Sequence, residues 1–265
     1  MDFNTPRIMG ILNLTPDSFY DGGKQSSLTS ILRNTESMLM DGADIIDIGA
    51  VSTRPGAKPV TEEEEISRLL DNVESLSKEF PEAIISIDTW RSNVARKTIE
   101  AGAHIINDIS GGTFDDYMLD TIAELHVPYI LMHIHGTPED MQMNPIETDV
   151  VKKVNIFFTD QLKKLKSIGV SEIILDPGFG FGKSLKSNYD LLKNLNQIDN
   201  DNLPVLAGIS RKSMINKILG TTPQEALTGT ISLNTIALLN GANILRVHDV
   251  KEAREAISLY NYYIK

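Results

Sequence analysis

The sequence predicts a single α/β domain folded as a barrel of eight parallel strands, each followed by a helix (a (β/α)8, or TIM, barrel). Eight short apolar runs recur along the 265 residues, and a stretch with helical pattern follows each of them. A doubly wound open sheet is the competing fold, but eight units fit closure into a barrel better. No long linker rich in proline, serine or glycine interrupts the chain, so we expect residues 1–265 to form one domain.

The predicted strands are short and rich in Ile, Val and Leu, as is typical of parallel strands buried on both faces. They cover residues 8–12, 44–48, 84–87, 104–107, 128–132, 172–175, 204–208 and 243–247. Amphipathic stretches between them predict helices, among them residues 28–41, 62–80, 92–101, 150–168 and 223–240. Gly42, Gly102, Gly169 and Gly241 each follow such a stretch, where a residue in the left-handed conformation commonly ends a helix.

Every predicted strand ends in a polar residue or cluster that is able to do chemistry. These are Asn13, Asp47, Asp88, Asn107, His133, Asp176, the cluster at residues 210–213, and Arg246 with His248. Four of the loops that follow strands are long and polar (residues 15–25, 50–61, 133–148 and 176–187), whereas the returns from helix to strand are short. Because such barrels work at the carboxyl ends of their strands, we expect the site at this end.

Three of these residues could read a heterocycle. Asp88, Asn107 and Asp176 end three different strands, and two carboxylates with an amide could pair with several N–H donors of a flat ligand. Helix N-capping is the alternative for Asp88 and Asn107, since both precede helices. Asp176 opens a glycine-rich loop at residues 176–182, which resembles a phosphate-binding loop only weakly. Its phenylalanines could line the ligand or fix the loop to the barrel.

The cationic candidates lie on the last two strands. Arg246 and His248 share one face of their strand, so both could project from the barrel mouth; for Arg246 the alternative is an ion pair with a neighbouring strand's carboxylate. Residues 210–213 open a helix directly after a strand, where free N–H groups favour anions. Lys212 could neutralise an acid, form a Schiff base, or be an ordinary solvated lysine.

Composition limits the possible partners. The formal net charge of -11 argues against a nucleic-acid surface, which would need a basic face. The chain has no cysteine, which excludes disulfides and thiolate metal sites and suits a reducing compartment, so we expect the cytoplasm. No signal peptide is visible, and no apolar run approaches the length that spans a membrane.

A dedicated metal cage is not evident in the sequence. No His/Asp cluster has suitable spacing, and the amide oxygen of Asn13 is a weak sole ligand unless phosphates supply the remaining oxygens, as magnesium tolerates. No Ser–His–Asp set is evident either. The residues alone therefore predict a barrel that binds a flat, N–H-rich heterocycle beside an anion, without defining the reaction.

Six motifs resemble those of the dihydropteroate synthases, in order and over essentially the whole chain. They occupy residues 9–19, 52–57, 107–112, 176–183, 210–213 and 246–249. The resemblance implies a transferase that joins 7,8-dihydropterin-6-ylmethyl diphosphate to 4-aminobenzoate, which releases diphosphate and 7,8-dihydropteroate for folate synthesis. It also implies a homodimer and a target of sulfonamides.

The resemblance further assigns roles to residues of this chain. Asp88, Asn107, Asp176 and Lys212 would hold the pterin; Asn13 would help to hold Mg²⁺ on the diphosphate, with Arg54, Arg246 and His248 as anion partners; Thr53, Phe181, Arg211, Lys212 and Ser213 would shape the aminobenzoate site. Asp88, Lys212, Arg246 and Asn13 are the residues expected to carry catalysis. Asp47 and His133 stay without a role.

The implied chemistry is dissociative: diphosphate leaves first, and the aryl amine captures a cation that Asp88 stabilises. The loops at residues 15–25 and 50–61 would close to exclude water, with Asp17 in the closed arrangement. Three rival functions remain open: a barrel that handles methyltetrahydrofolate for methyl transfer, a paralogue that binds pterin without turnover, and a Schiff-base lyase acting through Lys212.

Overall fold

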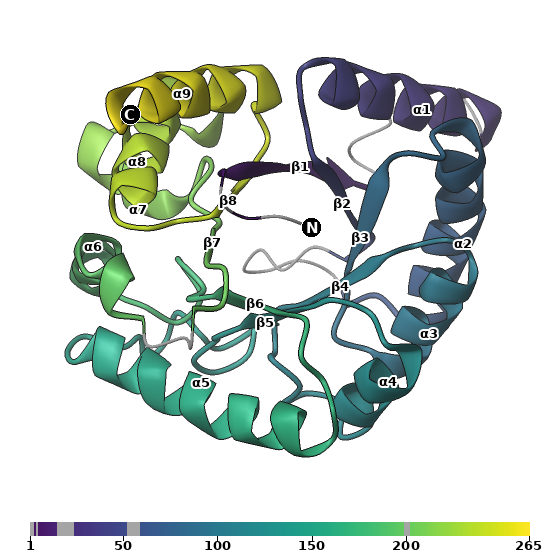
Figure 1. Cartoon of the computed structure of the whole chain (residues 1–265), viewed down its shortest axis with the longest axis horizontal. Coiled ribbons are helices and arrows are strands. Elements are labelled where there is room, and N and C mark those ends of the chain that lie inside the picture. The colour runs from purple at the N-terminus through teal and green to yellow at the C-terminus, as the bar shows by residue number, and fades with distance from the viewer. Residues whose placement is uncertain (1–2, 4, 15–23, 52–58, 199–201) are drawn as a thin grey trace.

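The computed structural model describes residues 3, 5–14, 24–51, 59–198 and 202–265. It confirms the predicted fold, with parallel strands in the centre and helices around them (Figure 1). The strands are β1 Arg7–Asn13, β2 Ile45–Gly49, β3 Ile84–Asp88, β4 Ile105–Asp108, β5 Tyr129–Met132, β6 Ile173–Asp176, β7 Leu206–Ala207 and β8 Ile244–Val247.

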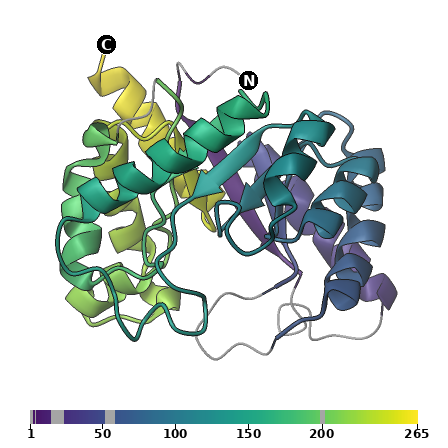
Figure 2. The same cartoon turned by 90° about the horizontal axis from the view of Figure 1, so that it is seen from below.

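The helices pack outside the sheet, as the side view shows (Figure 2). They are α1 Lys24–Met40, α2 Glu62–Glu79, α3 Ser92–Glu100, α4 Met118–Leu125, α5 Val150–Ser167, α6 Leu185–Lys193, α7 Ser213–Leu219, α8 Leu227–Leu239 and α9 Val250–Tyr263, with short 3₁₀ turns η2 Leu195–Gln197 and η3 Pro223–Glu225. The helix predicted at residues 223–240 is therefore divided into η3 and α8. A capping box between Thr222 and Glu225 starts η3, and α8 begins only after it.

The sheet closes through one narrow seam. Its strand order is β6-β5-β4-β3-β2-β1-β8-β7, with every pair of neighbours parallel. An isolated parallel bridge between Leu175 and Val205 joins the β6 and β7 edges, and the Leu175 N–H donates to the carbonyl of Pro204 at 2.9 Å. Strand β7 is shorter than the predicted residues 204–208.

Side chains that alternate along the strands form two separate apolar cores, one inside the barrel and one between the sheet and the helices. Inward-facing side chains form an apolar layer at the base of the barrel, made of Met9, Ile45, Ile105, Ile130, Ile174, Leu206 and Ile244. Outward-facing residues such as Ile46, Ile87 and Leu245 belong to the larger core beneath the helices. The next inward layer, toward the carboxyl ends, is polar.

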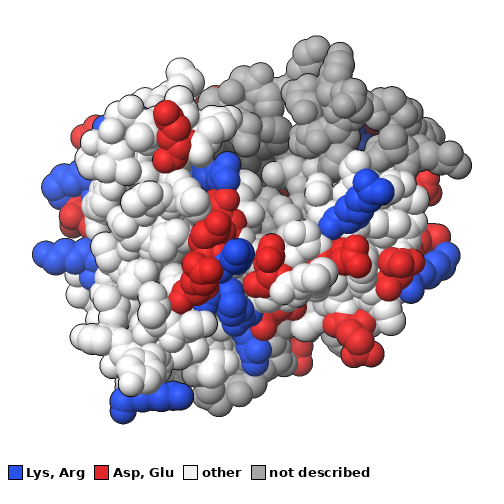
Figure 3. All heavy atoms as spheres, turned by 90° about the horizontal axis from the view of Figure 1, so that it is seen from above, with Lys and Arg blue, Asp and Glu red and all other residues white. Residues whose placement is uncertain are grey.

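The glycines that follow helices and the charges on the surface can also be compared with the predictions. Gly42, Gly102, Gly169 and Gly241 all have positive φ, as predicted. Basic and acidic side chains are interspersed on the face seen in Figure 3, rather than gathered into one basic patch. None of the helices that the structure describes is long and apolar enough to cross a membrane.

Candidate active site

The polar layer of the barrel is organised around Asp47, whose side chain is fully buried. Ser86 Oγ donates to its Oδ1 at 2.7 Å, while Asn107 Nδ2 at 3.1 Å and Arg246 Nε at 2.6 Å donate to its Oδ2. Three other strands thus converge on one carboxylate of β2. The sequence left Asp47 without a role, because none of these contacts lies within its own stretch of chain.

Arg246 crosses the mouth of the barrel to a second carboxylate. Its Nη2 donates to Asp88 Oδ2 at 2.6 Å, and its side chain is 18% exposed. The ion pair that the sequence left as the alternative for Arg246 is therefore present, with carboxylates of β2 and β3. Burial raises the pKa of Asp88 to about 7, although the Arg246 charge opposes that shift. The two carboxylates raise the pKa of Arg246 in turn, despite its own burial.

Helix capping, the alternative for Asp88 and Asn107, is not what these residues do. Arg91 is the N-cap of α3 and Tyr117 that of α4, neither with a side-chain capping bond. The N–H of Ser92 instead donates to the Asp115 carboxylate at 2.7 Å. Both predicted residues are thus directed to the barrel rather than to the helices that follow them.

Asp176 and Lys212 face each other across the seam. Asp176 is 4% exposed, and its Oδ1 accepts the Gly178 N–H at 2.7 Å. Burial raises the pKa of Asp176 and lowers that of Lys212 to about 8, each opposed by the other's charge. Lys212 Nζ also donates to the Phe179 carbonyl at 2.5 Å. The solvated-lysine interpretation of Lys212 is therefore wrong.

The two phenylalanines of the glycine-rich loop have different roles. Phe179 is fully buried in the core beneath the helices and fixes the loop to the barrel. Phe181 is half-buried, and Lys212 Nζ lies 4.7 Å from its ring centroid. Phe181 also packs with Trp90 and Phe114 against an apolar cluster at the mouth, which contains Ile109, Met132, Ile134 and Met141. A flat ligand would find an apolar surface beside the polar layer.

The remaining cationic candidates are tied to their neighbours. His248 Nδ1 lies 2.9 Å from Ser210 Oγ, which also accepts the His248 N–H at 3.2 Å. Arg211 donates to both carboxylate oxygens of Asp249, at 3.0 and 2.5 Å, so this guanidinium is neutralised within the protein. Ser213 is exposed at the start of α7.

The magnesium expectation rests on Asn13, which is exposed at the end of β1. Among the residues that the structure describes, no group of three or more His, Asp or Glu side chains is placed to hold a metal ion. The donor set therefore fits magnesium only if a bound diphosphate supplies most of the oxygens. Thr53, Arg54 and Asp17 lie outside the described residues.

His133 is not part of the barrel mouth. It shares its face of β5 with Tyr129 and Leu131, and its ring packs edge-on against Phe157 of α5 at 5.1 Å. Burial lowers its pKa to about 2, so the ring is neutral. Among the described residues, none is a hydrogen-bond partner of its Nδ1. The inward residue at the end of β5 is Met132, as its parity with Ile130 indicates.

Lys183 is a structurally central residue to which the sequence assigned no role. Its side chain is buried, and Nζ donates to the carbonyls of His133 at 3.2 Å, Gly178 at 2.8 Å and Phe181 at 3.0 Å. Burial lowers its pKa to about 7, with Asp176 opposing the shift. One ammonium thus joins the loops after β5 and β6. The sequence feature that could have indicated this role is the position of Lys183 at the end of the glycine-rich motif, residues 176–183.

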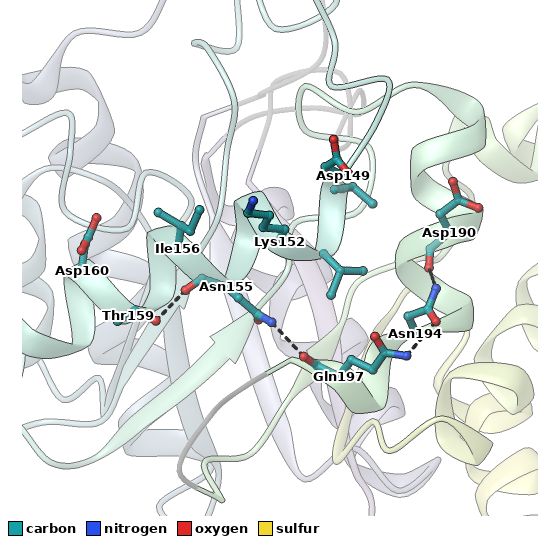
Figure 4. A pocket seen from close by; sticks show the side chains of 11 residues that line it. Asp149, Lys152, Asn155, Ile156, Thr159, Asp160, Asp190, Asn194 and Gln197 are labelled. Atoms are coloured by element: carbon teal, nitrogen blue, oxygen red, sulfur yellow. Dashed lines mark hydrogen bonds between the residues drawn. The ribbon is translucent and has the colours of Figure 1, made fainter.

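A cavity of about 760 Å³ lies elsewhere. It is an open groove between α5 and the segment α6–η2, outside the barrel (Figure 4). Several of its polar side chains bond one another or nearby backbone: Asn155 Nδ2 donates to the Gln197 carbonyl at 2.8 Å, and Gln197 Nε2 to Asn194 Oδ1 at 3.0 Å. We therefore place the site at the barrel mouth.

Comparisons with known proteins show what the chain is similar to. Residues 9–248 match the family described as pterin binding enzyme. The chain is 45% identical over 259 residues to the dihydropteroate synthase of Escherichia coli strain K12, which covers 97% of this chain and 91% of that protein. The Yersinia pestis dihydropteroate synthase, solved in complex with a sulfonamide drug, superposes with a TM-score of 0.93 at 41% identity, covering 100% of this chain and 96% of that one. The Xanthomonas albilineans dihydropteroate synthase with 4-aminobenzoic acid superposes with a TM-score of 0.92 at 36% identity, covering 100% of this chain and 95% of that one.

Proposed function

Because this chain belongs to the pterin binding enzymes, and among them to the dihydropteroate synthases of folate synthesis, we propose that it joins 7,8-dihydropterin-6-ylmethyl diphosphate to 4-aminobenzoate in the cytoplasm. The observation that carries the proposal is the convergence of Asp88, Asn107 and Asp176 with two cations, Lys212 and Arg246, in one barrel mouth. Acceptors beside cations suit an N–H-rich heterocycle that carries an anionic leaving group.

The pterin would lie between the polar layer and the apolar cluster. Asn107 and Asp176 are buried acceptors at the carboxyl ends of β4 and β6, and Phe181 offers a ring beside them. A polar edge held by fixed acceptors and a flat face held by apolar side chains are the two parts of a selective heterocycle site.

The diphosphate would be received by the cationic side of the mouth. Arg246 and His248 lie on β8 and directly after it, and Arg54 is our third anion partner, outside the described residues. Asn13 would contribute one oxygen to magnesium, with diphosphate oxygens as the other ligands. The bound ion would neutralise charge on the leaving group.

We propose a dissociative order of events. The bond between the pterin methylene and diphosphate breaks first, and the amine of 4-aminobenzoate then attacks the methylene cation and loses a proton. The carboxylate of Asp88, held by Arg246, stabilises that cation electrostatically. Lys212 and Phe181 border the incoming amine, with Thr53, Arg211 and Ser213 as further residues of that subsite. Sulfonamides would compete with 4-aminobenzoate for it.

The test is direct synthesis. Enzyme, magnesium, the pterin diphosphate and 4-aminobenzoate are mixed, and diphosphate and dihydropteroate are measured together. We expect equal amounts of both products when both substrates are present, and no dihydropteroate without 4-aminobenzoate. A preparation that binds a pterin but forms neither product at micromolar enzyme would support a non-catalytic pterin-binding paralogue instead.

Two rival enzymatic functions are less favoured by the site. A methyltetrahydrofolate-handling barrel would share the acceptors that read a pterin but has no use for cations such as Arg246 beside them. A Schiff-base lyase through Lys212 predicts that borohydride traps a carbonyl substrate on the enzyme. Lys212 is held by the Phe179 carbonyl and by the charge of Asp176, which suits a binding role.

A homodimer is our proposal for the assembly. Helices α7, α8 and α9 lie side by side (Figure 1), and large apolar side chains on them are exposed. These include Ile218, Leu219, Ile236, Leu239, Leu259, Tyr262 and Tyr263, each at least 41% exposed. Large apolar side chains exposed on neighbouring helices are typical of a protein interface. Light scattering should give twice the chain mass of 29.3 kDa, and Leu239→Glu should lower it to one chain.

A further inference from the structure

We propose that Asp47 is a positioning residue, which holds Asn107 with its amide oxygen toward the substrate and thereby selects a heterocycle edge that donates N–H groups. This inference rests on the proposed function, because it concerns the same site. Asp47 itself lies below the mouth, is fully buried, and acts through its neighbours.

The orientation of Asn107 follows from what Asp47 can do. The Asp47 carboxylate is paired with the Arg246 guanidinium and accepts hydrogen bonds, so the group of Asn107 that lies 3.1 Å from Asp47 Oδ2 is the amide nitrogen. The amide oxygen is on the other branch of the side chain and is turned away from Asp47. Without that carboxylate, either end of the amide could face a ligand.

The other contacts of Asp47 make this orientation rigid. Its Oδ1 accepts from Ser86, and its Oδ2 is shared between Asn107 and the Nε of Arg246. The carboxylate is thus held from three strands and cannot turn to release Asn107. A buried network whose members all have partners fixes one geometry.

The consequence is that three side chains on the heterocycle-reading side of the site all present acceptors. Asn107 presents an oxygen, and Asp176 and Asp88 present carboxylates. A ligand that offers a carbonyl oxygen where Asn107 expects an N–H would leave two acceptors facing each other without a proton. Sites built in this way reject such analogues strongly.

An exchange of the two side chains tests the idea. The probe is 6-hydroxymethyl-7,8-dihydropterin, which lacks the diphosphate and so does not depend on anion binding at Arg246. At pH 8, Asn107→Asp places two carboxylates in contact and should weaken probe binding at least thirtyfold. The double variant, Asp47→Asn with Asn107→Asp, restores one donor between the two positions and still presents oxygen to the ligand. Its affinity should return to within about fivefold of wild type.

Recovery in the double variant depends on the ligand contact being an acceptor, because a carboxylate introduced at position 107 could not replace a donating amide. A double variant that binds as weakly as Asn107→Asp alone would overturn the proposal. Should the double variant fail to fold, as judged by thermal melting, the wild-type enzyme decides by NMR. The side-chain amide protons of Asn107 should be slow to exchange in the free enzyme and should change little on adding the probe; protons that exchange freely and shift strongly would overturn it.

Asp44→Asn is the matched control. Asp44 precedes the same strand at the base of the barrel and also binds several donors: Ile8 N–H at 2.8 Å, Arg7 at 3.1 Å and Arg254 at 2.6 Å. This variant should lower the melting temperature and leave probe affinity within twofold. A wild-type enzyme that binds no pterin would contradict the proposed function, whereas wild-type binding without recovery in the exchange would contradict the role of Asp47 alone.

Discussion

The guanidinium of Arg246 on β8 lies 2.6 Å from the carboxylate of Asp88 on β3, although β1 and β2 separate these strands in the sheet. The contact spans the mouth of the barrel, and Asp47 on β2 supports it from below at 2.6 Å. One cation is therefore shared by two carboxylates. The same group that we propose to receive diphosphate also holds the residue that we propose to stabilise the cation.

Arg246→Ala should therefore damage both activity and folding. We expect kcat/KM to fall at least 100-fold, about 2.7 kcal/mol of transition-state stabilisation. Removing one partner of a buried ion pair also costs roughly 3–5 kcal/mol of folding free energy, because the carboxylates lose their counter-charge. The control is Lys265→Ala, at the exposed C-terminus. Equal losses of kcat/KM in the two variants would contradict the placement of the site.

The pKa of Asp88 predicts an acid limb in the rate. Burial raises this pKa to about 7, and only the ionised carboxylate can stabilise a cation. We expect kcat to fall as the pH drops below about 7, measured in steady-state kinetics at saturating substrates. An acid limb that persists unchanged in the residual activity of Asp88→Asn would assign the titration to another group.

The same shift predicts a dependence of stability on pH. The folded state holds the proton of Asp88 up to about pH 7, whereas the unfolded chain releases it near the ordinary pKa of 3.8. The contribution of Asp88 therefore favours folding at low pH and is lost as the pH rises through about 7. Between pH 5 and pH 8 the wild type should lose more melting temperature than Asp88→Asn.

The pKa of Lys212 predicts that activity declines at alkaline pH. Burial lowers its pKa to about 8, against the attraction of Asp176. A neutral amine would leave the Asp176 carboxylate without its cation, so activity should decline above about pH 8. Lys212→Arg keeps the charge at all accessible pH values. The residual activity of that variant should lack this decline; an identical alkaline decline would contradict the role of Lys212.

Lys183→Met should destabilise the protein. The variant leaves the carbonyls of His133, Gly178 and Phe181 without their donor, at a cost of about 3 kcal/mol or more. Lys186→Met, three residues along, removes an exposed i,i+4 ion pair with Asp190 and should cost less than about 0.5 kcal/mol. Urea unfolding measures both, and similar midpoints would show that the buried ammonium contributes little.

Gly178→Ala and Gly169→Ala separate two costs of replacing glycine. Both residues have positive φ, at 69° and 88°, which costs any other residue about 1–2 kcal/mol. At Gly178 a Cβ would also lie 2.0 Å from the carbonyl oxygen of His133, whereas at Gly169 no atom of the described part of the chain would lie within 4 Å of it. We expect Gly178→Ala to unfold at a urea concentration well below that of Gly169→Ala, and equal midpoints would exclude the steric contribution.

The fold could be predicted because its information is local. Apolar runs and glycine stops place strands within one or two residues, and parity correctly put Ser86, Asp88 and Arg246 on inward faces. Parity also contains the signal that His133 faces the helices. The division of the helix at residues 223–240 was missed because Pro223 fits the first turn of a helix as well as that of η3.

The hydrogen bonds and ion pairs of the site could not be predicted, because they join residues that are far apart in the sequence. Arg246 and Asp47 are 199 residues apart, and Asn107 and Asp47 are 60 apart. Nothing in either stretch of sequence indicates which carboxylate takes which donor. Lys183 was missed for a related reason: its three acceptors are backbone carbonyls, which every residue has.

Because the seam between β6 and β7 is narrow, we expect a bound ligand to stabilise the closure of the barrel. Asp176 ends one edge of the sheet, and Lys212 follows the other, so a heterocycle that contacts both groups connects the two edges where one backbone bridge does so now. Such a ligand holds the barrel closed at this seam. Amide hydrogen exchange along β6 and β7 should slow on binding more than it does along β1 and β2, which are already paired over five residues.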